Sequence, residues 1–150
     1  MAGHPSPEQL GPPSLKVDSF QLWVHGRQFP EAQDYDDGNW LRVTAHCGHA
    51  GASVWVTGSI LQVIDIVCWA QECETVGSGS AKMASLAPLE PELKVVIQTT
   101  DSLGHLEMTV EITPNHSQQE HLFRFEIDQS YIPSIVTQCR EIEKSYPIRN

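Results

Sequence analysis

Apolar and polar residues alternate along much of this chain, which is the pattern of a β-strand with one buried face. The clearest stretch is residues 105–112, where every second side chain is apolar. The same period runs through further segments, at 20–24, 41–45, 53–57, 93–97 and 123–127, and a short run at 81–86 could form another strand. The turn Asp101–Gly104 and the glycine-rich turn His46–Gly51 each lie between two such segments, so each predicts a β-hairpin.

Two other stretches have the period of an amphipathic helix. Ser59 precedes Gln62 by three residues, which is the spacing of a capping box, and predicts a helix from Ser59 to about Thr75. Ser130 predicts the start of a last helix, with Pro133 tolerated in its first turn. Because no βαβ units repeat, these elements predict an α+β fold, a mainly antiparallel β-sheet with two α-helices packed on one face.

The chain is expected to form one domain behind a short tail. Its 150 residues are enough to bury a core without disulfides or metals. Residues 1–14 contain four prolines and two glycines and little that is apolar, so they are predicted to be a disordered tail. Residues 15–150 then form a single α+β domain. The four cysteines are scattered and form no CxxC pair, which predicts reduced and mostly buried thiols.

The charge of the chain narrows its possible partners. There are 9 basic residues against 19 acidic ones, a formal net charge of −10. Such a surface repels phosphate backbones and anionic lipid headgroups, so nucleic acids and membranes are not expected as partners. A basic protein fits better, although solubility alone would also account for the charge. There is no signal-peptide pattern and no run of about 18 apolar residues, so a cytoplasmic location is expected.

Candidate metal and catalytic motifs are incomplete. His46, Cys47 and His49 lie close together, but a structural zinc site needs a fourth ligand. Residues 34–39 have the composition of a calcium loop, yet the glycine comes one place early and the twelfth position is not glutamate. The sequence contains no nucleophile elbow, phosphate-binding glycine loop or HExxH helix. We therefore expect no metal, no cofactor and no enzymatic activity.

Two neighbouring motifs resemble a known family. Residues 22–30 read LWVHGRQFP and residues 35–41 read YDDGNWL. This order of a strand, a turn ending in Phe-Pro and an Asn-Trp-Leu strand start resembles the opening of the WapI-type immunity proteins and their uncharacterised bacterial relatives. The resemblance continues more loosely over residues 19–146. It implies a bacterial protein that binds the C-terminal domain of a polymorphic toxin, often a nuclease, without catalysis. The sequence departs from the family pattern at His25 and Arg27.

The leading hypothesis is a stoichiometric protein-binding module that neutralises a toxin domain, possibly a basic nuclease. Its predicted contact patch combines carboxylates with an aromatic side chain, and comprises Glu31, Asp34, Tyr35, Asp36 and Asp37. A stand-alone small-ligand-binding protein or an orphan housekeeping protein is the second hypothesis, with a pocket between the polar loop and the open sheet face. A metal-assisted hydrolase that uses His46, His49 and the carboxylates of residues 34–37 is the third.

Overall fold

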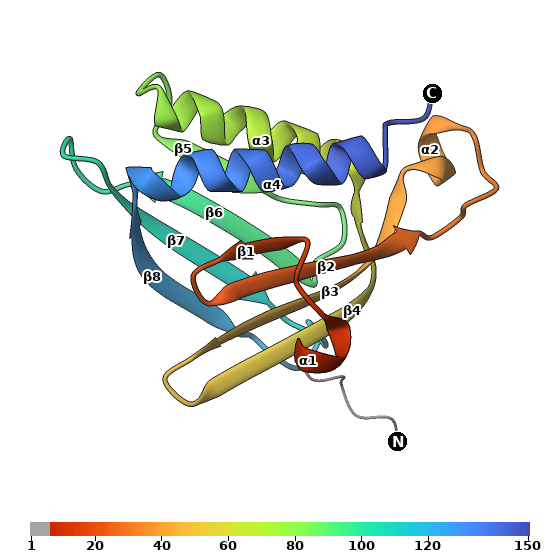
Figure 1. Ribbon diagram of the computed structural model, residues 1–150. Helices are drawn as coiled ribbons and strands as arrows, with labels where there is room; N and C mark the ends of the chain where they lie inside the picture. Colours follow the sequence, from red (N-terminus) through yellow and green to blue (C-terminus); the bar gives the residue numbers. More distant parts are fainter. Residues whose placement is uncertain (1–6) are drawn as a thin grey trace.

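The computed structural model describes residues 7–150, which form two antiparallel β-sheets and two long α-helices (Figure 1). Sheet A has the strand order β1 (Leu15–Val17), β2 (Phe20–Arg27), β3 (Trp40–His49) and β4 (Ala52–Gln62). Sheet B has the order β5 (Met83–Leu86), β6 (Leu93–Thr99), β7 (His105–Ile112) and β8 (Leu122–Asp128). Neighbouring strands are consecutive in the sequence, so each sheet is a meander.

The helices connect and flank these sheets. The short helices are α1 (Pro7–Leu10), α2 (Tyr35–Gly38) and the 3₁₀ turn η1 (Gln129–Tyr131), and the long ones are α3 (Val63–Gly77) and α4 (Ile132–Ser145). Helices α3 and α4 lie side by side (Figure 1), where α3 contacts β4 and β5 and α4 contacts β1. Among residues 7–150, no helix has the length and apolar character needed to cross a lipid bilayer.

The α+β class and the antiparallel pairing agree with the sequence prediction, but the single sheet does not. Helix α3 separates the strands into two sheets, and the two long helices contact strands of both. The prediction that both helices pack on one face of one sheet is therefore not confirmed. Alternation along a strand identifies its buried face, but it does not identify the strand with which it pairs.

The core lies between the sheets and under the helix pair. Strands β3 and β4 contact β7, and the inward side chains of both sheets join those of α3 and α4 in one apolar cluster. Trp69 of α3 and Val110 of β7 are fully buried within it. Burying one large apolar side chain contributes about 1.5–3 kcal/mol, so this shared cluster stabilises the packing of the two sheets against each other.

The predicted helix start at Ser59 is wrong. Strand β4 continues to Gln62, and α3 begins at Val63. The backbone N–H of Gln62 donates to the Asp65 carboxylate at 2.8 Å, so the capping box lies three residues later than expected. Leu61 is fully buried as a strand residue opposite Leu41 of β3. This pairing, which is invisible in the local pattern, decides between strand and helix.

The described end of the predicted N-terminal tail, residues 7–14, contacts β2. Residues 7–10 form α1, and the following residues are bonded to β2. The indole N–H of Trp23 donates to the carbonyl of Gly11 at 3.0 Å, and the backbone N–H of Val24 donates to the Ser14 hydroxyl at 3.0 Å. Residues 1–6 lie outside the described part of the chain, and the disordered tail over residues 1–14 stays a prediction.

Candidate functional site

The predicted contact residues lie on the connection between β2 and β3, at the end of the molecule beside the C-terminus (Figure 1). We call residues 31–37 the acidic loop. Its candidate side chains are all exposed, and they are those of Glu31, Asp34, Tyr35, Asp36 and Asp37. Tyr35 leaves 44% of its surface open to solvent. The structure thus gathers the five residues on one loop and one helical turn.

Helix α2 forms because Asp34 caps it. The Asp34 carboxylate accepts a hydrogen bond from the backbone N–H of Asp37 at 3.2 Å, and the Asp34 carbonyl accepts one from Gly38 at 3.0 Å. Residues 35–38 therefore form a single capped helical turn. Within residues 7–150, the side chains of Asp36 and Asp37 take part in no ion pair. Asp34 thus caps the helical turn, while the carboxylates of Asp36 and Asp37 are exposed.

A buried amide ties this loop to the end of the chain. Asn39 is 1% exposed, and its side-chain N–H groups donate to the carbonyls of Tyr35 and Arg149, both at 2.9 Å. Its side-chain oxygen accepts the backbone N–H of Arg149 at 2.8 Å. Asn39 and Arg149 are 110 residues apart in the sequence. The amide therefore holds α2 and the C-terminal segment in one fixed arrangement.

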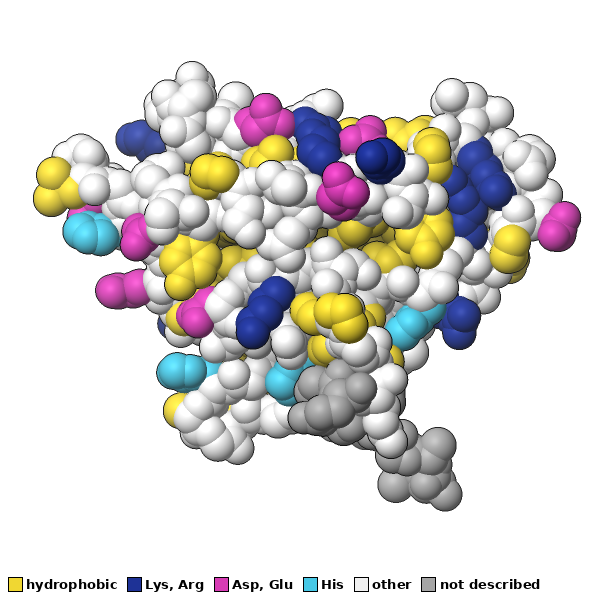
Figure 2. Space-filling view, in the orientation of Figure 1, with side chains coloured by type: hydrophobic (Ala, Val, Ile, Leu, Met, Phe, Trp, Pro, Cys, Tyr) yellow, Lys and Arg dark blue, Asp and Glu magenta, His cyan; other side chains and the backbone are white. Residues whose placement is uncertain are grey.

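Two arginines complete this attachment. The Arg149 guanidinium donates to the carbonyls of Pro30 and Ala32 at 2.8 and 2.6 Å. The Arg27 guanidinium donates to the carbonyl of Gly38 at 2.7 Å and to that of Pro147. Burial, followed by the nearby charge of Arg149, lowers the pKa of Arg27. In Figure 2, basic side chains gather at this end of the molecule.

We call Arg27, Asn39 and Arg149 the C-terminal clamp. Its members donate to backbone carbonyls around the acidic loop, so the loop is fixed from behind while its carboxylates face outward. The sequence motifs point to Arg27 and Asn39 as part of a conspicuous segment. Arg149 carries no such signal, because its partners are distant in the sequence.

The candidate zinc ligands do not converge. Cys47 is fully buried in the core, and burial raises the pKa of its thiol to about 12. His46 lies on the other face of β3, where its ring is 4.2 Å from that of Trp55 and its Nε2 is 2.7 Å from the Ser53 hydroxyl. Burial lowers the pKa of His46. Two of the three proposed ligands thus face away from each other, and the absence of a metal stays a prediction.

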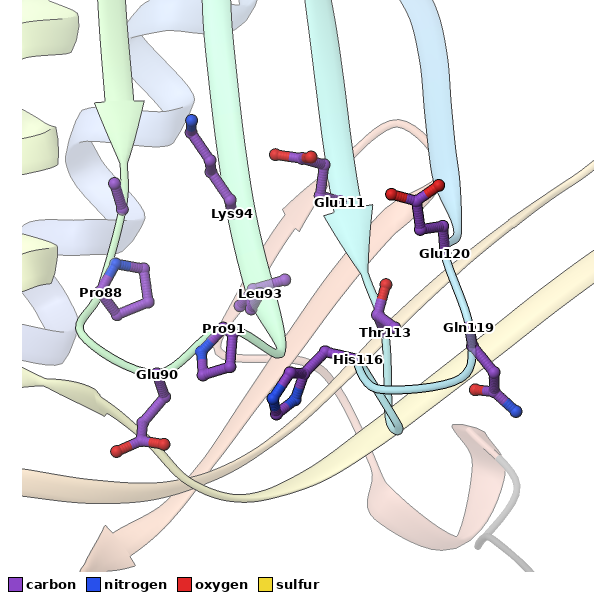
Figure 3. A pocket seen from close by; sticks show the side chains of 11 residues that line it. Pro88, Glu90, Pro91, Leu93, Lys94, Glu111, Thr113, His116, Gln119 and Glu120 are labelled. Carbon is purple, nitrogen blue, oxygen red and sulfur yellow. The ribbon is translucent and has the colours of Figure 1, made fainter.

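The structure also contains an acidic cleft that the sequence did not indicate. It has a volume of about 290 Å³ and lies between the β5–β6 and β7–β8 connections of sheet B. Figure 3 shows Glu90 and His116 on the two connections, with Lys94 and Glu111 on neighbouring strands. Lys94 and Glu111 are direct cross-strand partners. Its residues come from two stretches, 87–94 and 111–120, so no single stretch of sequence indicates the cleft.

These features define a small, acidic α+β domain that carries a firmly held, exposed acidic loop. A family model described as the immunity protein WapI-like family matches residues 14–147. The chain therefore belongs to the WapI-like immunity protein family, as the motifs at 22–30 and 35–41 indicated. No curated protein and no solved structure matches the chain.

Proposed function

We propose that this protein is a cytoplasmic, non-catalytic immunity protein that binds one protein toxin domain stoichiometrically and neutralises it. The observation that carries the proposal is the family match, which spans both sheets and both long helices. Members of such a family act by binding, so the relevant features are exposed surfaces with defined chemistry. The partner we propose is a basic domain, of the kind that a nuclease needs to hold phosphates.

The acidic loop is the contact patch we propose for this partner. Its backbone is held by the C-terminal clamp before binding, which lowers the entropy that binding must offset. Tyr35 offers an exposed aromatic anchor between carboxylates. The net charge of −10 adds a long-range field that speeds the approach of a basic partner.

The direct test uses the toxin domain encoded beside the gene in the source genome. Cells that produce the toxin domain are expected to grow only when this protein is also produced. The two purified proteins are expected to form a 1:1 complex, measured by size-exclusion chromatography with light scattering. Absence of both protection and a complex would reject the proposed function.

The contact patch needs a variant that leaves the helix cap intact. Reversing Asp36 and Asp37 to lysine keeps the Asp34 cap, and the control reverses Glu126 and Glu141, which changes the net charge equally at other exposed positions. We expect the loop variant to slow association by about tenfold or more at low salt, and the control to slow it less. Equal association rates for the two variants, measured at two salt concentrations, would remove the acidic loop from the interface.

A further inference from the structure

Strand β4 leaves one edge of sheet A without a neighbouring strand. It is the last strand in the order β1-β2-β3-β4, and within residues 7–150 it pairs only with β3. The outer edge of such a strand presents backbone N–H and C=O groups that can pair with a further strand. Proteins often use this property to bind an extended segment of a partner.

A depression runs along this edge. It has a volume of about 260 Å³ and is lined by six consecutive residues of β4, 55–60. Its opposite wall is formed by Glu90, Glu92 and Pro114 from the connections of sheet B. Six strand residues span about 20 Å, so the depression follows the strand over a length that an extended peptide segment can occupy. We call it the edge groove.

The wall of the edge groove is acidic and incompletely satisfied. One carboxylate oxygen of Glu92, Oε2, is shielded from solvent and has no hydrogen-bond partner within residues 7–150. A carboxylate oxygen in this position is costly unless a donor reaches it. Glu90 shares the same wall, and neither residue takes part in an ion pair in the described part of the chain. A cationic side chain in the groove would lie close to both carboxylates.

Two other depressions share Glu90 with the edge groove. Glu90 also lines a shallow depression with Phe29 and Trp40, directly before the acidic loop, and the acidic cleft of Figure 3. Phe29 is 47% exposed and supplies an apolar contact there. Among the described residues that line these three depressions, Lys94 is the only lysine or arginine. The three depressions therefore meet at Glu90, and their described linings carry more acidic than basic side chains.

We propose that an extended, basic segment of the protein partner adds to sheet A as a fifth strand along residues 55–60. Its backbone pairs with the outer edge of β4, beside which the described residues place no further strand. Alternate side chains of an extended segment point the same way, so lysines or arginines at every second position reach Glu90 and Glu92. Backbone pairing supplies affinity, and the two carboxylates select a basic segment. The inference rests on the proposed function for its protein partner and adds where and how that partner binds.

The first test measures hydrogen exchange of the full chain with and without the toxin domain. Formation of a fifth strand is expected to slow the exchange of backbone amides at residues 55–60 by at least tenfold. The second probe is a synthetic peptide of alternating lysine and valine, which is expected to protect the same amides. A peptide of alternating glutamate and valine is expected not to protect them. Binding of the toxin domain without any added protection of these residues would overturn the inference.

The second test removes the two carboxylates without changing the shape of the side chains. A double variant, Glu90→Gln and Glu92→Gln, is expected to bind the toxin domain at least tenfold more weakly. The matched control is Glu126→Gln with Glu141→Gln, which lie outside the groove, and it is expected to bind within twofold of the wild type. Thermal unfolding checks that both double variants fold. If a double variant does not fold, its two single variants are measured in its place.

The outcomes separate this inference from the proposed function. If the two double variants bind the toxin domain equally well, the edge groove is not the binding site, while the proposed toxin-binding function still stands. Failure of the wild type to bind the toxin domain overturns the proposed function. The lysine–valine peptide then tests strand addition at the edge groove by itself. Slower hydrogen exchange at residues 55–60 supports strand addition, and unchanged exchange rejects it.

Discussion

The C-terminal clamp leads to a quantitative prediction for Asn39→Ala. The side-chain amide of Asn39 makes three hydrogen bonds to backbone groups, at 2.9, 2.9 and 2.8 Å, and the residue is 1% exposed. Alanine leaves those backbone groups of Tyr35 and Arg149 without their partner. Each such bond contributes about 1 kcal/mol net, so we expect the free energy of unfolding to fall by about 3 kcal/mol. This is a large part of the roughly 5–15 kcal/mol that stabilises a typical domain.

Urea denaturation of the variant and the wild type measures this loss. The midpoint is expected to shift while the slope stays constant, because the same surface becomes exposed on unfolding. Gln33→Ala is the matched control, since Gln33 is an exposed amide on the same loop, and it is expected to change stability by less than about 0.5 kcal/mol. If Asn39→Ala also stayed within about 0.5 kcal/mol of the wild type, the clamp would not hold the acidic loop.

Three further predictions test the core, the thiols and the histidines. Val110→Asp places a carboxylate at a fully buried position and is expected to unfold the domain. Glu111→Gln, on the exposed side of the same strand, is expected to leave the midpoint of urea denaturation unchanged. Equal midpoints for the two variants would refute the strand assignment. A thiol reagent is expected to modify Cys68 alone in the native protein, because the other cysteines are buried; rapid modification of a second thiol would contradict this. By NMR, the pKa of His46 is expected below the ordinary 6.5 because of burial, and that of His105 above it because of its hydrogen bond to an aspartate. A lowered pKa means that His46 binds its proton more tightly in the unfolded chain than in the folded one. The stability that neutral His46 contributes is therefore present above pH 6.5 and is lost as the pH falls below it. His46→Gln is expected to weaken this loss of stability at acidic pH.

Local patterns predicted the strands well where alternation and a turn occur together. The segment 105–112 is β7, and the turn before it forms because the Asp101 carboxylate accepts the backbone N–H of Leu103 at 2.7 Å. The boundary near Ser59 failed because the apolar run after it fits both a strand and a helix. The predicted number of sheets was wrong for a related reason, since the number of sheets depends on pairing between distant segments.

In the candidate site, too, some residues could be predicted from the local sequence and others could not. The five residues of the acidic loop are adjacent in the sequence, so composition alone could propose them. The clamp could not be proposed, because Asn39 and Arg149 are 110 residues apart and no sequence motif includes Arg149. The edge groove depends on which strand is left at the edge of sheet A, and on a carboxylate from sheet B that faces it. Tertiary arrangement alone brings these groups together.

The clamp also sets an order of events during translation. The acidic residues leave the ribosome well before the guanidinium and backbone groups of Arg149, which fasten their loop and follow Asn39 by 110 residues. A nascent or prematurely terminated chain therefore carries the acidic residues without their support. The rigid form of this loop becomes available only once synthesis has passed residue 149, so a chain cut short would present its carboxylates on a loosened segment.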